Sequence, residues 1–148
     1  MDIRLITEDK KRFLPLLLLA DEEEAMIDRY LARGDLFALY DGDLKSVCVV
    51  TDEGEGVYEL QNLATDARYQ RMGYASALVQ HIFTHYQGRC RTMLVGTGDS
   101  PMTLPFYAHC GFTFSHRIEN YMLEHYSQPI YEDGKQLFDK IYLTRTFP

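Results

Sequence analysis

The sequence predicts a mixed α/β protein in which a mostly antiparallel sheet carries helices on both faces. Two apolar stretches flank the dipeptide Asp41-Gly42, which favours a tight antiparallel hairpin. Between Val57 and Gly96 a strand pattern, a helix pattern and a second strand pattern follow one another. This order predicts a right-handed parallel crossover. Two further strand patterns, at residues 112–116 and 138–147, are expected to close the sheet.

The N-terminal third is expected to contain one strand and two helices. Residues 3–6 predict a short strand, and residues 7–19 predict a helix that Thr7 caps and that Pro15 must kink or restart. In the next helix Asp21 and Glu24 have the spacing of a capping box, and Gly34 suits the C-terminal end. We therefore interpret the acidic run at residues 21–24 as a helix start.

The next predicted elements indicate where a ligand pocket is expected. Strands are predicted at residues 36–40, 44–50, 57–64 and 92–96, and an apolar stripe at helical spacing predicts a helix over residues 74–86. Ser100 can cap a further helix that begins near Thr103 and ends at Gly111. A long, aromatic-rich and partly irregular segment joins the two closing strands. In such crossovers ligands bind at the carboxyl ends of the strands, so we expect the pocket between residues 64 and 97.

Composition narrows the classes of partner. The length of 148 residues and the hydrophobic content of 46% fit one domain over residues 1–148, and the net charge of −7 argues against nonspecific binding to nucleic acid or an anionic membrane. A cationic small molecule or a lysine-bearing peptide is the easier partner.

Cys48, Cys90 and Cys110 lack C-x-x-C spacing, which favours buried thiols in a reducing cytoplasm over a disulfide framework or zinc site. His81 and His85 are interpreted as surface or packing residues, without a metal.

One short loop predicts an anion site. Gln70, Arg71, Met72 and Gly73 lie between the strand that ends near Ala64 and the helix that begins at Tyr74. Gly73 lets the backbone turn, and amides at a helix N-terminus favour a polyphosphate; the alternative is an ordinary helix start that binds nothing. Residues 67–98 contain four arginines and no acidic residue, whereas the other 116 residues carry 11 basic and 22 acidic side chains. We expect this positive island to coincide with the loop.

These motifs resemble those of the GNAT superfamily of N-acetyltransferases, over nearly the whole chain. The segment from Leu63-Ala64-Thr65 through Gln70-Arg71-Met72-Gly73-Tyr74-Ala75 resembles the family's Q/R-x-x-G-x-G/A pyrophosphate loop. Residues 106–112, ending in Cys110-Gly111-Phe112, resemble the family's helix that ends in Gly-Phe. One helix and one strand separate the two motifs, as in the family.

The resemblance implies a GNAT-like fold with the sheet splayed between its two parallel strands and acetyl-coenzyme A as cosubstrate, without a metal. It implies a pyrophosphate held by the amides of residues 71–76, a pantetheine arm along the edge of residues 63–65, and an oxyanion-stabilising amide at Leu63 or a neighbour. Ser100 occupies the place of an asparagine that contacts the pantetheine in many members, and serine is shorter. The implied cofactor-binding residues are Leu63, Ala64, Thr65, Gln70, Arg71, Met72, Gly73, Tyr74, Ala75, Ser76, Ser100 and Tyr107.

Two side chains are candidates for proton transfer. An amine must lose its proton before it attacks, and Glu59 lies where the histone-acetylating branch of the family has a glutamate base. The alternatives are an ordered water path as base, and a Glu59 that faces solvent or pairs with an arginine. Tyr107 matches the tyrosine that protonates the departing thiolate, or it orients the sulfur by hydrogen bonding alone. His116, Tyr121, Tyr126 and Glu132 could line the acceptor pocket, although core packing explains them equally well.

The function that the resemblance implies is direct transfer of acetyl to a primary amine within a ternary complex. Polyamines, aminoglycosides and protein N-termini are acceptors that an acidic chain favours. The alternative is a GNAT-like module that binds coenzyme A as a sensor or assembly element, and a second alternative is an enzyme for a longer acyl chain. A homodimer through strand edges is a further expectation from the family.

Overall fold

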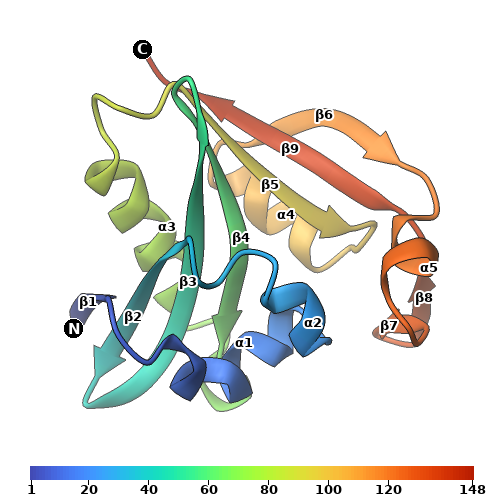
Figure 1. Cartoon of the computed structure of the whole chain (residues 1–148), viewed down its shortest axis with the longest axis horizontal. Helices are drawn as coiled ribbons and strands as arrows, with labels where there is room; N and C mark the ends of the chain where they lie inside the picture. Colours follow the sequence, from blue (N-terminus) through green and yellow to red (C-terminus); the bar gives the residue numbers. More distant parts are fainter.

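The computed structural model describes residues 1–148 and is built around one twisted, seven-stranded mixed sheet (Figure 1). The strand order is β1-β2-β3-β4-β5-β9-β6, and only β4 and β5 run parallel. The elements are β1 (Asp2–Ile6), a 3-10 turn (Lys10–Phe13), α1 (Leu14–Ala20), α2 (Glu24–Ile27), β2 (Asp35–Asp41), β3 (Asp43–Gly54), β4 (Val57–Thr65), a 3-10 turn (Ala67–Tyr69), α3 (Tyr74–His85), β5 (Thr92–Gly98), α4 (Thr103–His109), β6 (Thr113–Ile118), α5 (Tyr121–His125), β7 (Ile130–Glu132), β8 (Lys135–Leu137) and β9 (Lys140–Thr146).

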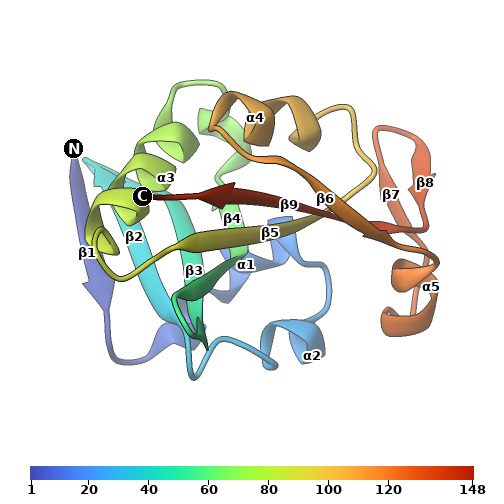
Figure 2. The same cartoon turned by 90° about the horizontal axis from the view of Figure 1, so that it is seen from above.

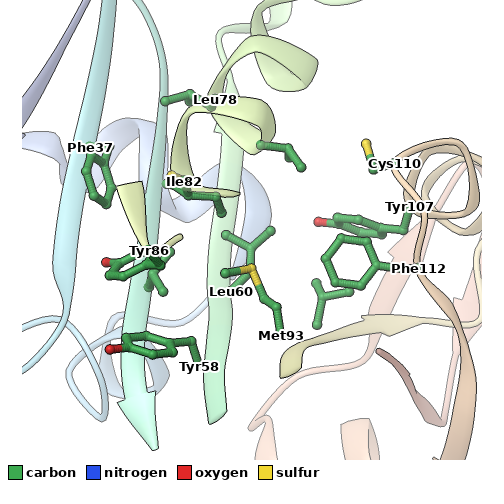
Figure 3. Close-up of a cluster of buried hydrophobic side chains, with 14 of the residues drawn as sticks. Phe37, Tyr58, Leu60, Leu78, Ile82, Tyr86, Met93, Tyr107, Cys110 and Phe112 are labelled. Carbon is green, nitrogen blue, oxygen red and sulfur yellow. The ribbon is translucent and has the colours of Figure 1, made fainter. Parts of the chain in front are cut away.

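Helices cover both faces of the sheet, as predicted. Figure 2 shows α3 and α4 on one side and α1 and α2 on the other. The larger core lies under α3, which buries Leu78, Val79 and Ile82 at helical spacing against the sheet (Figure 3). A second core lies between α1, α2 and the strands β2 and β3. None of the helices combines the length and the apolar character that a membrane crossing requires.

The hairpin and the parallel crossover are confirmed. β2 and β3 pair antiparallel around Gly42, whose φ of 82° is the turn conformation that favours glycine. β3 continues to Gly54, four residues beyond the predicted end, because its later residues pair with β4. β4 and β5 pair in parallel, with α3 as the crossover helix.

The predicted start of the first helix at Thr7 is wrong. A 3-10 turn comes first, and α1 begins only at Leu14, so that Pro15 lies in its first turn where no backbone donor is needed. Proline therefore restarts the helix, which is one of the two outcomes we considered.

The capping box at Asp21 and Glu24 is also wrong. The short helix α2 begins at Glu24, and no side-chain hydrogen bond caps it. Asp21 instead accepts hydrogen bonds from two tyrosine hydroxyls, so tertiary partners outcompete the local cap. The predicted longer helix does not form; turns follow α2 up to Gly34, which touches Val49 and leaves no room for a side chain.

The segment between β6 and β9 is more regular than its sequence indicated. It forms α5 and the hairpin β7-β8, which turns at Asp133 and Gly134 with φ values of 51° and 79°. These are the positive values of a tight hairpin turn, so the Asp-Gly pair was a signal from which this hairpin could have been predicted. In both views α5 and the hairpin lie beyond one end of the sheet (Figures 1 and 2).

Candidate active site

The site is created where the two parallel strands separate. β4 and β5 pair only from Val57 with Thr92 to Leu60 with Val95, and beyond this point their ends diverge. β4 also carries a bulge: Leu60 pairs with Val50 and Asn62 with Val49, so Gln61 is the extra residue. Before the bulge Leu60 faces the core under α3, and after it Asn62 and Ala64 face α1. The bulge therefore turns Asn62 and Ala64 towards the α1 side.

A cleft of about 930 Å³ occupies the gap between the diverging strands. Its walls come from the end of α1 with α2, from the edges of β4 and β5, from the start of α4, and from α5, β7 and β9. The carboxyl ends of β4 and β5 open into it, as predicted. Of the residues predicted for the site, Glu59, Leu63, Ala64, Thr65, Gln70, Arg71 and Tyr107 line this cleft.

The loop before α3 presents backbone donors at one end of the cleft. Arg71 and Gly73 have positive φ values of 63° and 90°, which fold the chain sharply into the helix. The first intrahelical bond of α3 runs from the Ala77 amide to the Gly73 carbonyl at 3.0 Å, so the amides of residues 74–76 belong to the unpaired first turn. No side chain caps this end of the helix. These unpaired amides follow Gln70 and Arg71, which line the cleft.

The positive island does not gather at this loop. Arg71 alone among its four arginines lines the cleft. Arg68 is paired with Asp66, whereas Arg89 and Arg91 follow the far end of α3, where Arg89 donates to the His85 carbonyl. The prediction that the island coincides with the loop is wrong, because a helix of 12 residues carries the later arginines away from the loop to the other end of α3.

The edge of β4 offers backbone groups to the cleft. Beyond Leu60 this edge has lost β5 as a partner, while the other edge still pairs with β3 up to Thr65. The side chain of Ala64 belongs to the core beside α1, and the Thr65 hydroxyl lies 3.0 Å from the Ser46 hydroxyl. Residues 63–65 therefore face the cleft mainly with main-chain donors and acceptors.

Ser100 does not line the cleft. It is fully buried, and its Oγ accepts hydrogen bonds from the amides of Met102 and Thr103 at the start of α4 and donates to the Glu132 carboxylate. The hydroxyl is thus occupied by capping α4 and by anchoring β7. Its side chain is therefore not part of the cleft lining.

Glu59 lies on the cleft side of β4, half-buried and without an ion pair. Burial raises the pKa of its carboxyl, and the positive charge of Lys140 partly offsets this effect. Of the alternatives that the sequence left open, the arginine ion pair does not form, and a Glu59 that faces solvent from a half-exposed strand remains compatible with its partial burial. The geometry suits a carboxylate of increased basicity within the cleft.

Tyr107 extends from α4 into the larger core and lies beside Phe112 (Figure 3). Its ring packs edge-on against Phe106 and Phe112, and the side chain is almost fully buried at the wall of the cleft. Burial, with smaller contributions from Cys110 and Cys48, raises the pKa of Tyr107 well above its usual value. The phenol therefore remains protonated at neutral pH and is a hydrogen-bond donor.

A chain of hydrogen bonds that the sequence did not reveal closes one side of the cleft. The Tyr30 and Tyr126 hydroxyls donate to the two carboxylate oxygens of Asp21 at 2.8 and 2.6 Å, and the Asn62 amide group donates to the Tyr30 hydroxyl at 3.1 Å. Ser127 adds two bonds to Glu23. The segment after α5 is thus tied to the turn between α1 and α2.

Two residues of β9 that were not predicted for the site also line the cleft. Lys140 and Tyr142 alternate with the core residues Ile141 and Leu143, and therefore face the cleft. The alternation is visible in the sequence, but its direction depends on the pairing with β5. Of the four acceptor-pocket candidates, Tyr121, Tyr126 and Glu132 line the cleft, whereas His116 is outside this lining and stacks on Tyr142.

Metal-ligating groups are not gathered here. The structure contains no group of three or more His, Cys, Asp or Glu side chains that could hold a metal ion. His81 and His85 pack against the ring of Phe37, which agrees with the packing role predicted for them.

Comparison with known proteins identifies the family. Residues 4–112 match the model of the Acetyltransferase (GNAT) family. The chain belongs to the GNAT acetyltransferase family. It is therefore an N-acetyltransferase, an enzyme of the acyltransferase class, as the loop and helix motifs predicted.

Related acetyltransferases cover the whole chain. The chain is 31% identical over 144 residues to the uncharacterized N-acetyltransferase YvbK of Bacillus subtilis (strain 168), covering 95% of this chain and 93% of that protein. A GNAT acetyltransferase from Elizabethkingia anophelis, solved with acetyl-CoA bound, superposes with a TM-score of 0.92 at 27% identity over 99% of this chain and 97% of that one. A Bacillus subtilis acetyltransferase in complex with CoA has a TM-score of 0.89 at 31% identity over 99% and 98%. The GNAT fold predicted from the motifs is confirmed.

Proposed function

We propose that this acetyltransferase transfers acetyl from acetyl-CoA directly to a primary amine within a ternary complex. The separation of β4 and β5 carries the proposal, because it leaves a cleft that joins a backbone anion site at α3 to a half-buried carboxylate. Cofactor and acceptor would enter this cleft together. No covalent enzyme intermediate is part of the proposal.

Support for acetyl-CoA as the cosubstrate comes from two sources. The relatives from Elizabethkingia anophelis and Bacillus subtilis hold acetyl-CoA and CoA. In this chain the loop at residues 70–73 and the unpaired amides of α3 suit a diphosphate. The free edge of β4 at residues 63–65 suits the amide groups of a pantetheine arm.

Glu59 is the proposed general base, directly or through one water. An amine with a pKa near 10.4 is neutral in only about one molecule in a thousand or more at pH 7, so attack needs a proton acceptor. Burial of Glu59 raises the pKa of its carboxyl, which increases its basicity. The carboxylate faces the same cleft as the unpaired edge of β4.

Tyr107 is the proposed partner of the departing thiolate. Transfer from a phenol to a thiolate runs uphill by about 2 kcal/mol for unperturbed groups. Burial raises the pKa of Tyr107 and makes full transfer harder still. A hydrogen bond from the phenol to the sulfur, with the proton supplied onward from water, is consistent with this environment.

The proposed acceptor is a small amine or a peptide amine. Carboxylates from the α1–α2 turn, β4 and β7 line the cleft, which favours an amine that arrives protonated. Tyr126 also lines the cleft, whereas the rings of Tyr121 and Tyr142 already contact Lys140.

The test combines binding with turnover. Calorimetric titration with CoA should give one site per chain, and a panel of amines with acetyl-CoA should release thiol for at least one acceptor. E59Q and Y107F should each lower kcat by about a hundredfold or more at saturating substrates. E55Q in an exposed turn and Y58F in the core are matched controls that should keep kcat.

The outcomes separate the enzyme class from the roles. Full turnover in both E59Q and Y107F would remove the two role assignments while leaving acetyl transfer intact. Binding of CoA without thiol release for any amine would favour a module that binds the cofactor as a sensor. Absence of CoA binding would overturn the proposal as a whole.

A further inference from the structure

The Lys140 side chain reaches the cleft by passing over a glycine of the neighbouring strand. Its backbone pairs with Gly98 of β5, but the side chain runs back along the neighbouring strand and lies over Gly96. A Cβ at position 96 would overlap Lys140 Cε and would lie 3.2 Å from Nζ. β5 therefore has no side chain at position 96, where the Lys140 ammonium lies.

The Lys140 ammonium has aromatic neighbours and no carboxylate partner. Nζ lies 4.5 Å from the ring centre of Tyr121 and 5.0 Å from that of Tyr142. Lys45, another lysine with little exposed surface, has Asp43 as its ion-pair partner, whereas Lys140 forms no ion pair. A largely buried ammonium is costly to desolvate, so its retention here needs a reason beyond filling space.

The register of the strands directs this charge towards Glu59. Glu59 pairs with Leu94, and Leu94 lies two residues before Gly96 on the same strand. Side chains two residues apart on a strand share a face. The ammonium over Gly96 and the carboxylate of Glu59 thus line the same stretch of the cleft.

Among the charged groups near Glu59, Lys140 is the cation that has no carboxylate partner. Glu53 on β3 and Arg33 after α2 act on Glu59, but they form an ion pair with each other at 2.9 Å. Tyr142 on β9 is influenced by both Lys140 and Glu59 and remains neutral in the neutral range, because burial raises its pKa. Of the two cations that act on Glu59, only Lys140 has no carboxylate partner.

We propose that Lys140 is a positioning residue that keeps the half-buried Glu59 carboxylate ionised and therefore able to accept the proton of the acceptor amine. This inference rests on the proposed role of Glu59. An uncompensated carboxyl in the same place would hold its own proton at higher pH. Lys140 thus sets the lower pH limit of turnover without touching the reacting atoms.

The test measures Glu59 directly. In protein labelled with ¹³C at the glutamate carboxyl and saturated with CoA, the Glu59 signal is assigned by its loss in E59Q and is titrated by NMR. Its midpoint should move upward by about half a pH unit or more in K140M, and the acid limb of kcat/KM should move by the same amount. K140R should restore both, since it keeps the charge.

Two further measurements keep the outcome decisive. K140Q is a second neutral variant if K140M fails to fold, and the reciprocal effect is measured in E59Q, where Lys140 should titrate at lower pH than in the wild type. An unchanged Glu59 midpoint in both neutral variants overturns the proposal. Full activity of E59Q would instead refute Glu59 as base, and the NMR coupling would still report on the pair.

Discussion

The Lys140 side chain occupies the space beside Gly96 where a Cβ at position 96 would lie. G96A should therefore destabilise the fold modestly, by about 1 kcal/mol, because the overlapping atoms are the flexible end of the lysine and can shift. Urea unfolding of wild type and variant measures this loss. In the K140A background the same change should cost far less, because the overlapping side chain is gone. An equal loss in both backgrounds would show that Lys140 is not the group that requires the glycine.

Gly73 should matter for backbone conformation and not for space. Its φ is 90°, yet nothing lies within 4 Å of the position that a Cβ would take, so G73A should cost about 1 kcal/mol in stability from strain and weaken CoA binding severalfold by moving the amides of the loop. Gly88 is the matched control, with a φ of 86° and open space beyond the other end of α3. G88A should lose similar stability and keep the wild-type CoA affinity in calorimetry. Equal affinities in both variants would argue against the loop as the diphosphate site.

Local patterns predicted β4, α3, β5 and α4, whereas long-range contacts determined the other walls of the cleft. The stripe of α3 and the Asp41-Gly42 turn depend on residues close in sequence, so they could be predicted. Asp21 was assigned to a helix cap, although its hydrogen-bond partners are the hydroxyls of Tyr30 and of Tyr126, which lies 105 residues away. The extra residue Gln61 carries no sequence signature, since a bulge is defined by the partner strand.

Gly96 of β5 and the four arginines of residues 67–98 also show that local sequence patterns do not reveal which residues meet in space. Gly96 within a strand indicates that some group approaches closely, but only the fold identifies Lys140 as that group. Four arginines clustered in sequence are separated in space, because α3 lies between Arg71 and Arg89. Charge counted along a chain therefore predicts a surface patch only when no long element intervenes.

Glu59 should lower stability at neutral pH. Burial raises the pKa of its carboxyl in the folded state above the unfolded value, so its stabilising contribution is present at low pH and is lost as the pH rises through the folded pKa. E59Q should therefore unfold at higher temperature than wild type near pH 8, and the difference should shrink as the pH approaches 4.5, the ordinary value for the group. Calorimetric melting at both pH values measures the effect. The exposed Glu55 is the control, and a pH-independent difference for E59Q would contradict this account.

The Asp21–Tyr126 hydrogen bond should hold the segment after α5 against the α1–α2 turn. Y126F removes a donor from a carboxylate and should cost about 2 kcal/mol in urea unfolding. The amide of Ser127, which donates to Glu23 at 2.6 Å, should exchange its hydrogen faster in this variant. Y131F, at an exposed tyrosine of β7, is the matched control and should change neither quantity. Because Tyr126 donates to the charged Asp21 carboxylate, Y126F should cost less in a D21N background. Equal costs in the two backgrounds would place the origin of the effect outside this hydrogen bond.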